Sequence, residues 1–599
     1  MKRKGALMIF ISHLRNLAAR KTLAAKQRCS AGLSATIRRP GRRIGVPALL
    51  ILLSGGLYLT PAQAGAVYQW SVRCPSIKGR RAYLWIPPKC KRVRGLIVAC
   101  QNMLERPLFA NAQFRAAAAR NDLGLVLIFP GHDKGVNDGN NPDHPKRSYL
   151  DIFLNPNYPH GHMNPKAAGK DLQKVLNRLA TVSGYPELRN APLMPVGHSS
   201  AGNFVWYLYR WNPGRIFAML PFKTGPRSDG PLEIPILEVN SEWFDYGNRS
   251  DNVAFGKFNL APRLQVRARG KQSLFGYYVD VGSGHCNVSA QCIPIVAQFM
   301  TDAVKMRIPR HAPLSGPVRL KTVNAGKGWL LNAATIGQPG DHAVAYSSWK
   351  GNPASAFWYL SRGMAMAVQS QMQAELAKRP QQIGYMHADK LFAHGGMFSI
   401  YPHFLADGAT FELHAVYIKH LAASNLFPKG FTLGHSTEPI HYAVTSGAII
   451  QVGRNRFRIC PHAGPLVPQG NPWQPTVIAY SPGGKQWQPT VHPAHINIHI
   501  FNTTGKPQTL LFPAIPNQRT GHLAALTLGA TASSGLPVEY FMVSGPARIK
   551  GTVLQFTRIP RRATFPMKVI VGAYQWGREI HPRIRSVGPV LRTFYLAGK

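Results

Sequence analysis

The string MPVGHSSAG at 194–202 places a serine where a buried strand pattern meets a helix pattern. A chain that turns this sharply holds one side chain exposed above the sheet, and small residues two before and two after it keep the backbone from clashing. Gly197 and Ala201 meet this requirement around Ser199. Ser200 is the alternative nucleophile, but that choice puts His198 two residues before the nucleophile, where a small residue is needed. We therefore predict that Ser199 is a catalytic nucleophile.

A serine hydroxyl attacks a carbonyl only when a base takes its proton, and a histidine in that role needs a carboxylate to hold its tautomer. His285 follows the strand pattern at 275–281, where we expect the base. Glu242 and Asp245 both follow the strand pattern at 234–239, so either could orient the histidine. The spacing slightly favours Asp245, and Glu242 is alternatively a structural partner for an arginine.

The tetrahedral oxyanion of an acyl transfer needs two N–H donors. Ser200, directly after the predicted nucleophile, is expected to supply the first. The second should come from the loop after an early buried strand, expected at Gly95–Cys100, and the candidates there are Asn102 and Met103. That loop has no His-Gly-Gly string, so the choice between the two stays open.

Strand and helix patterns alternate through the first half of the chain, which predicts a mostly parallel sheet covered on both faces. We expect strands at 82–86, 95–100, 123–129, 193–196, 234–239 and 275–281, and helices at 109–119, 201–211, 293–306 and from Pro165 onward. Beyond Pro309 the pattern changes to short strands with Gly and Pro, and one helix is expected at 361–378. The long segment 133–165, rich in Asn, Pro, Gly and His, is expected to be a functional loop.

Over about Tyr68–Pro309 the chain resembles the α/β-hydrolase superfamily. The resemblance covers the sharp strand-to-helix turn around Ser199, called the nucleophile elbow, the histidine base and the order of the strands. The family elbow is G-x-S-x-G, and Ala201 stands where its second glycine would be. The resemblance implies hydrolysis of an ester, thioester or peptide through an acyl-enzyme, with no cofactor. Histidines gather at 160–162 and 492–499 without nearby carboxylate or cysteine partners, so we expect no metal site.

The last part of the chain, about Phe512–Lys599, resembles the bacterial immunoglobulin-like modules of secreted proteins. The strings that carry this resemblance are SSGLPV at 533–538, VSGPA at 543–547 and VIVGA at 569–573. It implies a β-sandwich at the C-terminus. The expected fold class is thus α/β, an α/β-hydrolase sheet with flanking helices followed by β-rich domains. The expected domains are 1–64 (signal peptide with a basic extension), 65–312 (catalytic), 313–510 (β-rich) and 511–599 (immunoglobulin-like).

The leader is basic and holds no acid, and it runs through the apolar segment Ile44–Leu59 to a small-x-small site that ends at Ala64. This is typical of a secretory signal peptide cleaved near Ala64, and the apolar run is shorter than a membrane span requires. We expect a secreted or periplasmic protein that uses the Sec route, with Arg42 and Arg43 as a weak twin-arginine signal. In such a compartment Cys74 with Cys90, and Cys286 with Cys292, are the disulfides that short spacing favours.

The formal charge is +47, and removal of the twelve Lys and Arg of the leader would leave +35. This excess favours contact with an anionic polysaccharide or the cell envelope, or reflects adaptation to an acidic medium, which we rank first because the charge is spread along the chain. No nucleic-acid-binding motif stands out, so we expect no nucleic-acid partner. The predicted function is hydrolysis of carboxylic esters, with a polymeric or glycan-linked acyl substrate as a hypothesis. The alternatives are an exported serine peptidase and a non-catalytic cell-surface or glycan-binding protein on a hydrolase scaffold.

Overall fold

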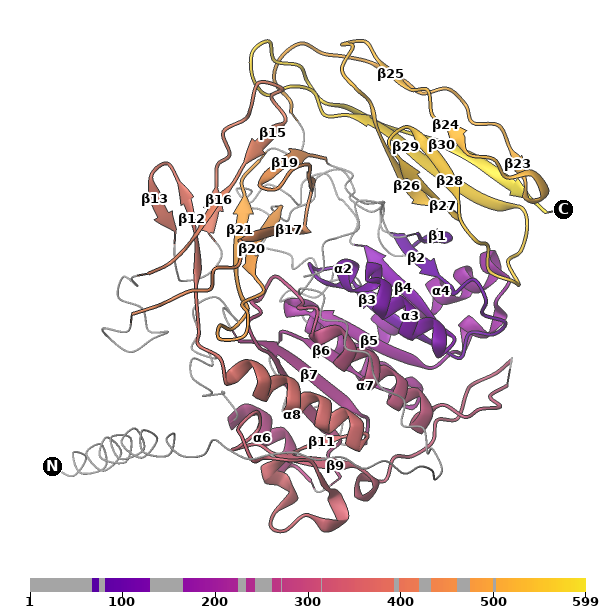
Figure 1. Ribbon diagram of the computed structural model, residues 1–599. Coiled ribbons are helices and arrows are strands. Elements are labelled where there is room, and N and C mark those ends of the chain that lie inside the picture. Colours follow the sequence, from indigo (N-terminus) through magenta and orange to yellow (C-terminus); the bar gives the residue numbers. More distant parts are fainter. Residues whose placement is uncertain are drawn as a thin grey trace, which may run out of the picture. The chain divides into compact units, whose positions relative to one another are not determined.

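The structure is a computed structural model (Figure 1). It describes residues 67–74, 81–129, 165–224, 233–242, 261–270, 272–313, 315–392, 398–419, 432–460, 475–498 and 502–598. The chain divides into two compact units, Met1–Ser54 and Gly55–Lys599, and every described residue belongs to the second. The predicted signal peptide, most of the long loop at 133–165 and Asp245 lie outside the described residues. None of the helices described is long and apolar enough to cross a membrane.

Eight strands of the first half form one mixed sheet in the order β1-β2-β4-β3-β5-β6-β7-β8. The pairs β1–β2 and β2–β4 are antiparallel, and every pair from β4–β3 to β7–β8 is parallel. This sheet, with a strand-to-helix turn after β5, is the α/β-hydrolase arrangement and confirms the fold class predicted for this region. The strands are β1 (Trp70–Arg73), β2 (Arg81–Trp85), β3 (Gly95–Cys100), β4 (Leu123–Phe129), β5 (Leu193–His198), β6 (Leu220–Phe222), β7 (Ile236–Ser241) and β8 (Phe275–Asp280).

Helices pack beside this sheet (Figure 1), and α3 contacts α7 while α4 contacts α5. The helix expected from Pro165 onward is confirmed as α4, and its apolar residues Leu172, Val175, Leu176 and Leu179 are all fully buried. The single helix expected at 109–119 is instead two helices. Asn111 between them is extended, and its Oδ1 accepts the N–H of Phe114 at 2.9 Å, which caps the second helix. The helices are α2 (Glu105–Ala110), α3 (Ala112–Arg120), α4 (Pro165–Ser183), α5 (Gly202–Trp211), α6 (Ala261–Ala268) and α7 (Cys292–Arg307).

The segment directly after the hydrolase sheet packs against it. Trp358 and Tyr359 are buried, and the hydroxyl of Tyr359 donates to the carbonyl oxygen of Tyr277 in β8 at 2.6 Å. This segment therefore shares one apolar core with the hydrolase sheet. Its elements are β9 (Trp329–Asn332), β10 (Val344–Ala345), β11 (Ala356–Tyr359) and α8 (Arg362–Leu376), the last of which confirms the helix expected at 361–378.

A separate core lies between residues 383 and 496. The strands around it form three small sheets, β13-β12-β16, β14-β21-β20-β17 and β15-β19-β18. Their bounds are β12 (Ile383–His387), β13 (Lys390–Phe392), β14 (Phe398–Ile400), β15 (Thr410–Glu412), β16 (His414–Tyr417), β17 (His441–Ser446), β18 (Ile449–Gln451), β19 (Arg456–Ile459), β20 (Thr476–Ser481) and β21 (Thr490–Ile496).

The C-terminal part is built from short strands in three sheets, β23-β30-β29-β26, β24-β28-β27 and β22-β25. The rings of Phe556 in β28 and Phe594 in β30 meet edge to face, with centroids 6.3 Å apart, so the two larger sheets pack together. The β-rich character is confirmed, whereas the immunoglobulin-like assignment stays a prediction. The bounds are β22 (Leu510–Leu511), β23 (Gln518–Arg519), β24 (Leu526–Thr527), β25 (Thr531–Ala532), β26 (Glu539–Ser544), β27 (Ala547–Lys550), β28 (Val553–Phe556), β29 (Met567–Gln575) and β30 (Val587–Ala597).

The two predicted disulfides, Cys74–Cys90 and Cys286–Cys292, are not formed in the structure, which holds no disulfide among its six described cysteines. The Sγ of Cys90 is engaged elsewhere and donates to the carbonyl oxygen of Arg92 at 3.0 Å. Burial raises the pKa of Cys90 to about 12 and that of Cys292 well above its usual range, so both thiols hold their protons. Short spacing along the chain therefore did not predict bonding in this fold.

Candidate active site

Ser199 occupies the sharp turn between β5 and α5, with a left-handed φ of 55°. A residue with a side chain rarely adopts this conformation, and where it does the surrounding structure enforces it. Two glycines make room for the turn. A Cβ on Gly197 would lie 2.0 Å from the carbonyl oxygen of Ala201, and one on Gly202 would lie 2.4 Å from the Oγ1 of Thr224. The second close approach thus falls on Gly202, which explains why alanine is tolerated at 201.

His285 lies on the loop after β8 and is partly exposed. The elbow and this loop meet directly, because the Nε2 of buried His198 is 2.8 Å from the carbonyl oxygen of His285 and donates to it. The two rings also lie against each other, with centroids 4.7 Å apart. Burial, followed by the neighbouring His285 and Lys223, lowers the pKa of His198 well below its usual range, so it is neutral. The structure therefore brings the predicted nucleophile and base to the same end of the sheet.

The loop after β3 is tied to the elbow through the buried carboxylate of Glu105. Its Oε1 accepts the N–H of His198 at 2.7 Å, and its Oε2 accepts the N–H groups of Asn102 and Met103 at 2.9 and 3.0 Å. The Nδ2 of Asn102 adds a bond to the carbonyl oxygen of His198 at 2.8 Å. The structure thus gives the two candidate oxyanion donors a different partner from the one expected, because a buried carboxylate needs N–H donors of its own. The loop does lie beside the elbow, where a second donor must come from.

Glu242 is buried at the end of β7, and its Oε2 accepts the N–H of Gly282, three residues before His285, at 2.7 Å. Burial, with a smaller contribution from the carboxylates of Glu375 and Asp280, raises the pKa of Glu242 to about 8. Its described bond therefore supports the backbone of the histidine loop.

A second buried carboxylate, within β7 itself, has an arginine partner of the kind considered for Glu242. Glu238, also buried, accepts from the Nε of Arg263 at 2.9 Å. Burial hides both groups from water, so the pair is a structural element of β7 and α6 rather than part of the reacting centre.

Sequence reasoning missed a buried charge pair beneath the histidine loop. Lys223 directly follows β6, Asp280 ends β8, and both side chains are fully buried with the Nζ and Oδ2 atoms 3.8 Å apart. Asp280 also accepts the N–H of Ser289 at 3.0 Å and the hydroxyl of the same serine. The available signal was a charged residue at the end of each of two apolar strands, next to the carboxyl edge where such folds place their sites.

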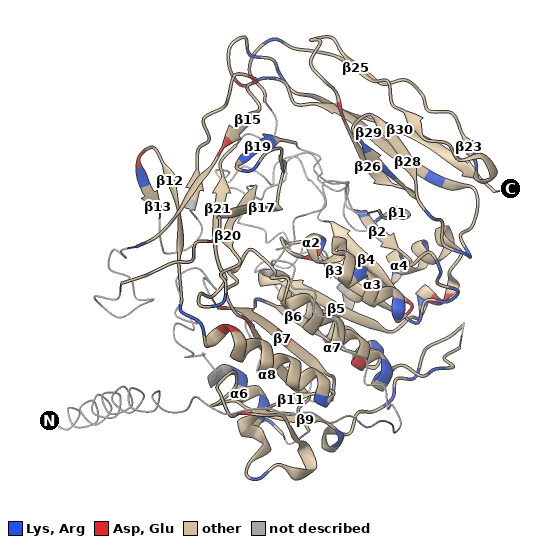
Figure 2. Ribbon diagram, viewed as in Figure 1, with Lys and Arg blue, Asp and Glu red and all other residues tan. Residues whose placement is uncertain are grey.

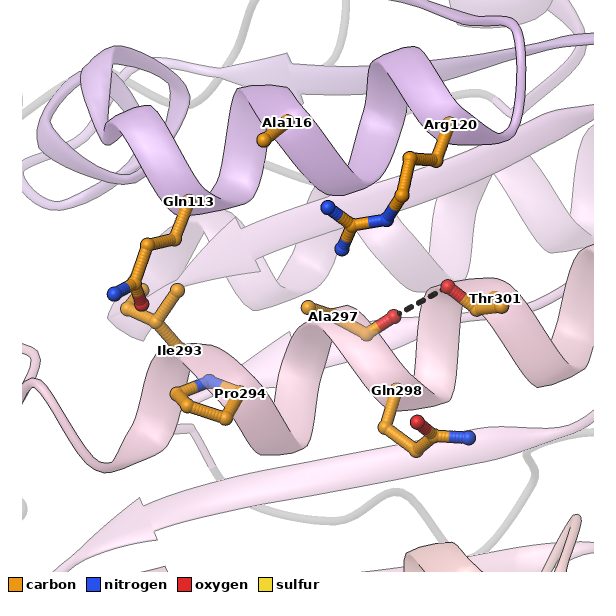
Figure 3. A pocket seen from close by; sticks show the side chains of 8 residues that line it. All are labelled: Gln113, Ala116, Arg120, Ile293, Pro294, Ala297, Gln298 and Thr301. Atoms are coloured by element: carbon orange, nitrogen blue, oxygen red, sulfur yellow. Dashed lines mark hydrogen bonds between the residues drawn. The ribbon is translucent and has the colours of Figure 1, made fainter. Parts of the chain in front are cut away.

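Within the described residues no group of three or more His, Cys, Asp or Glu side chains could hold a metal ion. One pocket lies elsewhere, between α3 and α7, and contains none of the candidate catalytic residues (Figure 3). In it the Oγ1 of Thr301 donates to the carbonyl oxygen of Ala297 at 2.9 Å, and Arg120 and Gln298 supply polar groups (Figure 3). The basic residues, which outnumber the acidic ones by 71 to 24, are distributed over the hydrolase and β-rich regions alike (Figure 2).

No family model and no curated protein matches this chain. Several solved structures are similar to part of it. An S-formylglutathione hydrolase from Agrobacterium tumefaciens is 12% identical, with 39% of this chain and 92% of that chain covered and a TM-score of 0.28. A dienelactone hydrolase from Anabaena variabilis is 13% identical, with coverages of 41% and 100% and a TM-score of 0.27. A poly(3-hydroxybutyrate) depolymerase from Bordetella parapertussis is 16% identical, with coverages of 39% and 87% and a TM-score of 0.26.

Proposed function

We propose that the protein is an exported serine hydrolase that cleaves carboxylic esters through an acyl-enzyme. Ser199 attacks the acyl carbonyl, and His285 takes the serine proton and later delivers it to the leaving group. The observation that carries the proposal is the left-handed φ of Ser199 at the turn between β5 and α5. A strained serine between two close-packed glycines, beside a histidine loop, is the arrangement that a nucleophile elbow needs.

We assign the orienting carboxylate to Asp245. Glu242 already uses one oxygen for the N–H of Gly282, and its raised pKa favours a neutral carboxyl that would stabilise an imidazolium poorly. The Asp245→Asn variant should therefore lose kcat by about 10³- to 10⁴-fold, as loss of the orienting acid does in serine proteases. Glu242→Gln should lose far less. If Glu242→Gln instead lost more kcat than Asp245→Asn, the orienting carboxylate would be Glu242.

The oxyanion is proposed to take the backbone N–H of Ser200 and one donor from the loop at Asn102 and Met103. Both candidate N–H groups donate to Glu105. The second donor therefore becomes available only when one of these N–H groups leaves the Glu105 carboxylate and donates to the substrate oxyanion instead. A donor of this kind contributes about 10²- to 10³-fold in rate.

The first test is labelling of the purified full chain with a fluorophosphonate, followed by mapping of the modified peptide. We expect the label on Ser199, with loss of labelling in Ser199→Ala and retention in Ser200→Ala. A chain that stays unlabelled while a control hydrolase reacts would favour the non-catalytic scaffold. Once labelling succeeds, a panel of esters and peptides separates an esterase from a serine peptidase.

The natural substrate is proposed to be an acyl group on an anionic polymer, which the positive charge of the protein attracts. Attraction between a basic protein and an anionic glycan weakens as salt screens it. Turnover of an acetylated acidic polysaccharide should therefore fall between 50 and 500 mM NaCl, whereas turnover of a neutral acetyl ester should not. Equal salt dependence for both substrates would mean that the positive charge does not recruit the substrate, and adaptation to an acidic medium would then explain this charge.

A further inference from the structure

We propose that Lys223 is a positioning residue for the reaction, because its ammonium group holds the loop of His285 from both sides of the histidine. This inference rests on the proposed function, and its test includes a measurement that does not depend on catalysis.

The ammonium group of Lys223 is directed at a single loop. Its Nζ donates to the Oγ of Ser283 at 2.9 Å, to the carbonyl oxygen of Gly284 at 2.5 Å, and to the carbonyl oxygen of Asn287. An ammonium group carries three N–H donors, so it can bind several oxygen atoms of the loop at once. Two acceptors precede His285 and one follows it, which fixes the backbone on either side of the predicted base.

The loop is closed around this ammonium group by its own bonds. The Oδ1 of Asn287 accepts the N–H of Gly284 at 2.7 Å, and the N–H of Ser283 donates to the carbonyl oxygen of Asp280 at 3.0 Å. The Asp280 carboxylate, 3.8 Å from the Nζ of Lys223, balances the charge that burial would otherwise disfavour. An apolar side chain at 223 would fill the space but leave the loop carbonyls without a donor.

The backbone of Lys223 is held as firmly as its side chain. The residue has a left-handed φ of 49°, and its N–H donates to the carbonyl oxygen of Val239 in β7 at 2.6 Å. Because the side chain is also fully buried and its ammonium group bonds three atoms of the loop, the ammonium group is held in one position. His198, on the elbow itself, bonds the carbonyl oxygen of His285, so the fixed loop also sets the histidine against the nucleophile.

The test compares Lys223→Met with Ser283→Ala and with Arg267→Met. Arg267 is a matched control, because it is likewise fully buried and donates to backbone carbonyls, among them that of Ala356 at 2.7 Å, but it lies on α6 away from the histidine loop. Each variant is measured in three ways: amide hydrogen exchange of the peptide that spans 282–289, the rate of fluorophosphonate labelling per folded molecule, and kcat and KM for an ester.

We expect Lys223→Met to exchange the amides of 282–289 faster and to label about 10- to 100-fold more slowly, with a fall in kcat at nearly unchanged KM, since a small displacement of a catalytic group costs about 10²-fold in rate. Ser283→Ala should also speed the amide exchange of 282–289 and slow the labelling, but by less than Lys223→Met does. It keeps the lysine and so tests the loop even if Lys223→Met fails to fold. Arg267→Met should lower the melting temperature while labelling of its folded fraction stays within about twofold of wild type.

Two results would overturn the inference. One is unchanged exchange of 282–289 in the variants of Lys223 and Ser283, and the other is labelling slowed equally by Arg267→Met. Failure of the proposed function is a separate result. Even if the wild-type chain takes no label, hydrogen exchange of 282–289 in the wild type and the variants still shows whether Lys223 holds the loop.

Discussion

The buried carboxyl of Glu242 makes the stability of the protein depend on pH in an unusual direction. Its pKa is raised from 4.5 to about 8 in the folded protein. Below pH 4.5 it is protonated whether the chain is folded or unfolded. Between these values the unfolded chain releases the proton and the folded chain keeps it, so the stability of the fold falls as pH rises. At 1.36 kcal/mol per pKa unit, the loss across this window is at most about 5 kcal/mol.

The Glu242→Gln variant removes this dependence, because an amide carries no proton to release and its oxygen can still accept the N–H of Gly282. About 4 kcal/mol of this loss falls between pH 5 and pH 8.5, and a compact unit of this size changes its melting temperature by about 1–2 °C per kcal/mol. We therefore expect the melting temperature of the wild type to fall by roughly 4–8 °C more than that of the variant over this range. Thermal unfolding followed by tryptophan fluorescence measures the difference, with Glu438→Gln, an exposed carboxylate, as the control. Parallel pH profiles for wild type and Glu242→Gln would refute the reasoning.

Two further predictions concern packing. Gly197→Ala should abolish labelling and reduce the soluble yield, since its Cβ would lie 2.0 Å from a backbone carbonyl oxygen. Gly214→Ala, whose nearest neighbour would be 3.8 Å away, should behave as wild type. Arg562→Ala removes the arginine that lies 3.1 Å from the buried carboxylate of Glu187 and leaves this carboxylate the N–H of Val93 as a donor. The change should cost about 1–3 kcal/mol, seen as a lower melting temperature and faster limited proteolysis. Arg548→Ala, on an exposed strand position, is the control and should change neither measurement.

The sequence predicts the centre of the sheet well. Strands at 95–100 and 123–129 are buried on both faces, so they read as continuous apolar runs, and the structure places them at these bounds. The turn at Ser199 is also predictable, because close packing of the backbone restricts the residue types around it. At the sheet edge and in short strands the signal is weaker, and β6 has three residues, one of which is proline, too few to show a period.

Long-range polar contacts could not be predicted from local patterns. Lys223 meets acceptors about sixty residues away. Its place directly after an apolar strand indicates the carboxyl edge of the sheet, but its neighbours in the sequence do not show which loop it contacts. Glu105 begins a short helix, where a carboxylate is commonly exposed, yet it bonds the N–H of His198, 93 residues later. In both cases the residue's role depends on which strands become neighbours, and the fold rather than the sequence spacing decides that.

The bond between Ser71 in β1 and Ser544 in β26 joins residues 473 positions apart, and the N–H of Gly545 donates to the carbonyl oxygen of Tyr68 in the same region. The first strand of the hydrolase sheet is therefore covered by a part of the chain that a ribosome makes far later. At about 5–20 residues per second, this delay is roughly 25–95 s. During that interval the edge of the nascent sheet has no cover, and an uncovered edge can pair with other chains. A chain truncated before β26 would keep this edge uncovered, and it should therefore be more prone to aggregate through β1 than the full chain is.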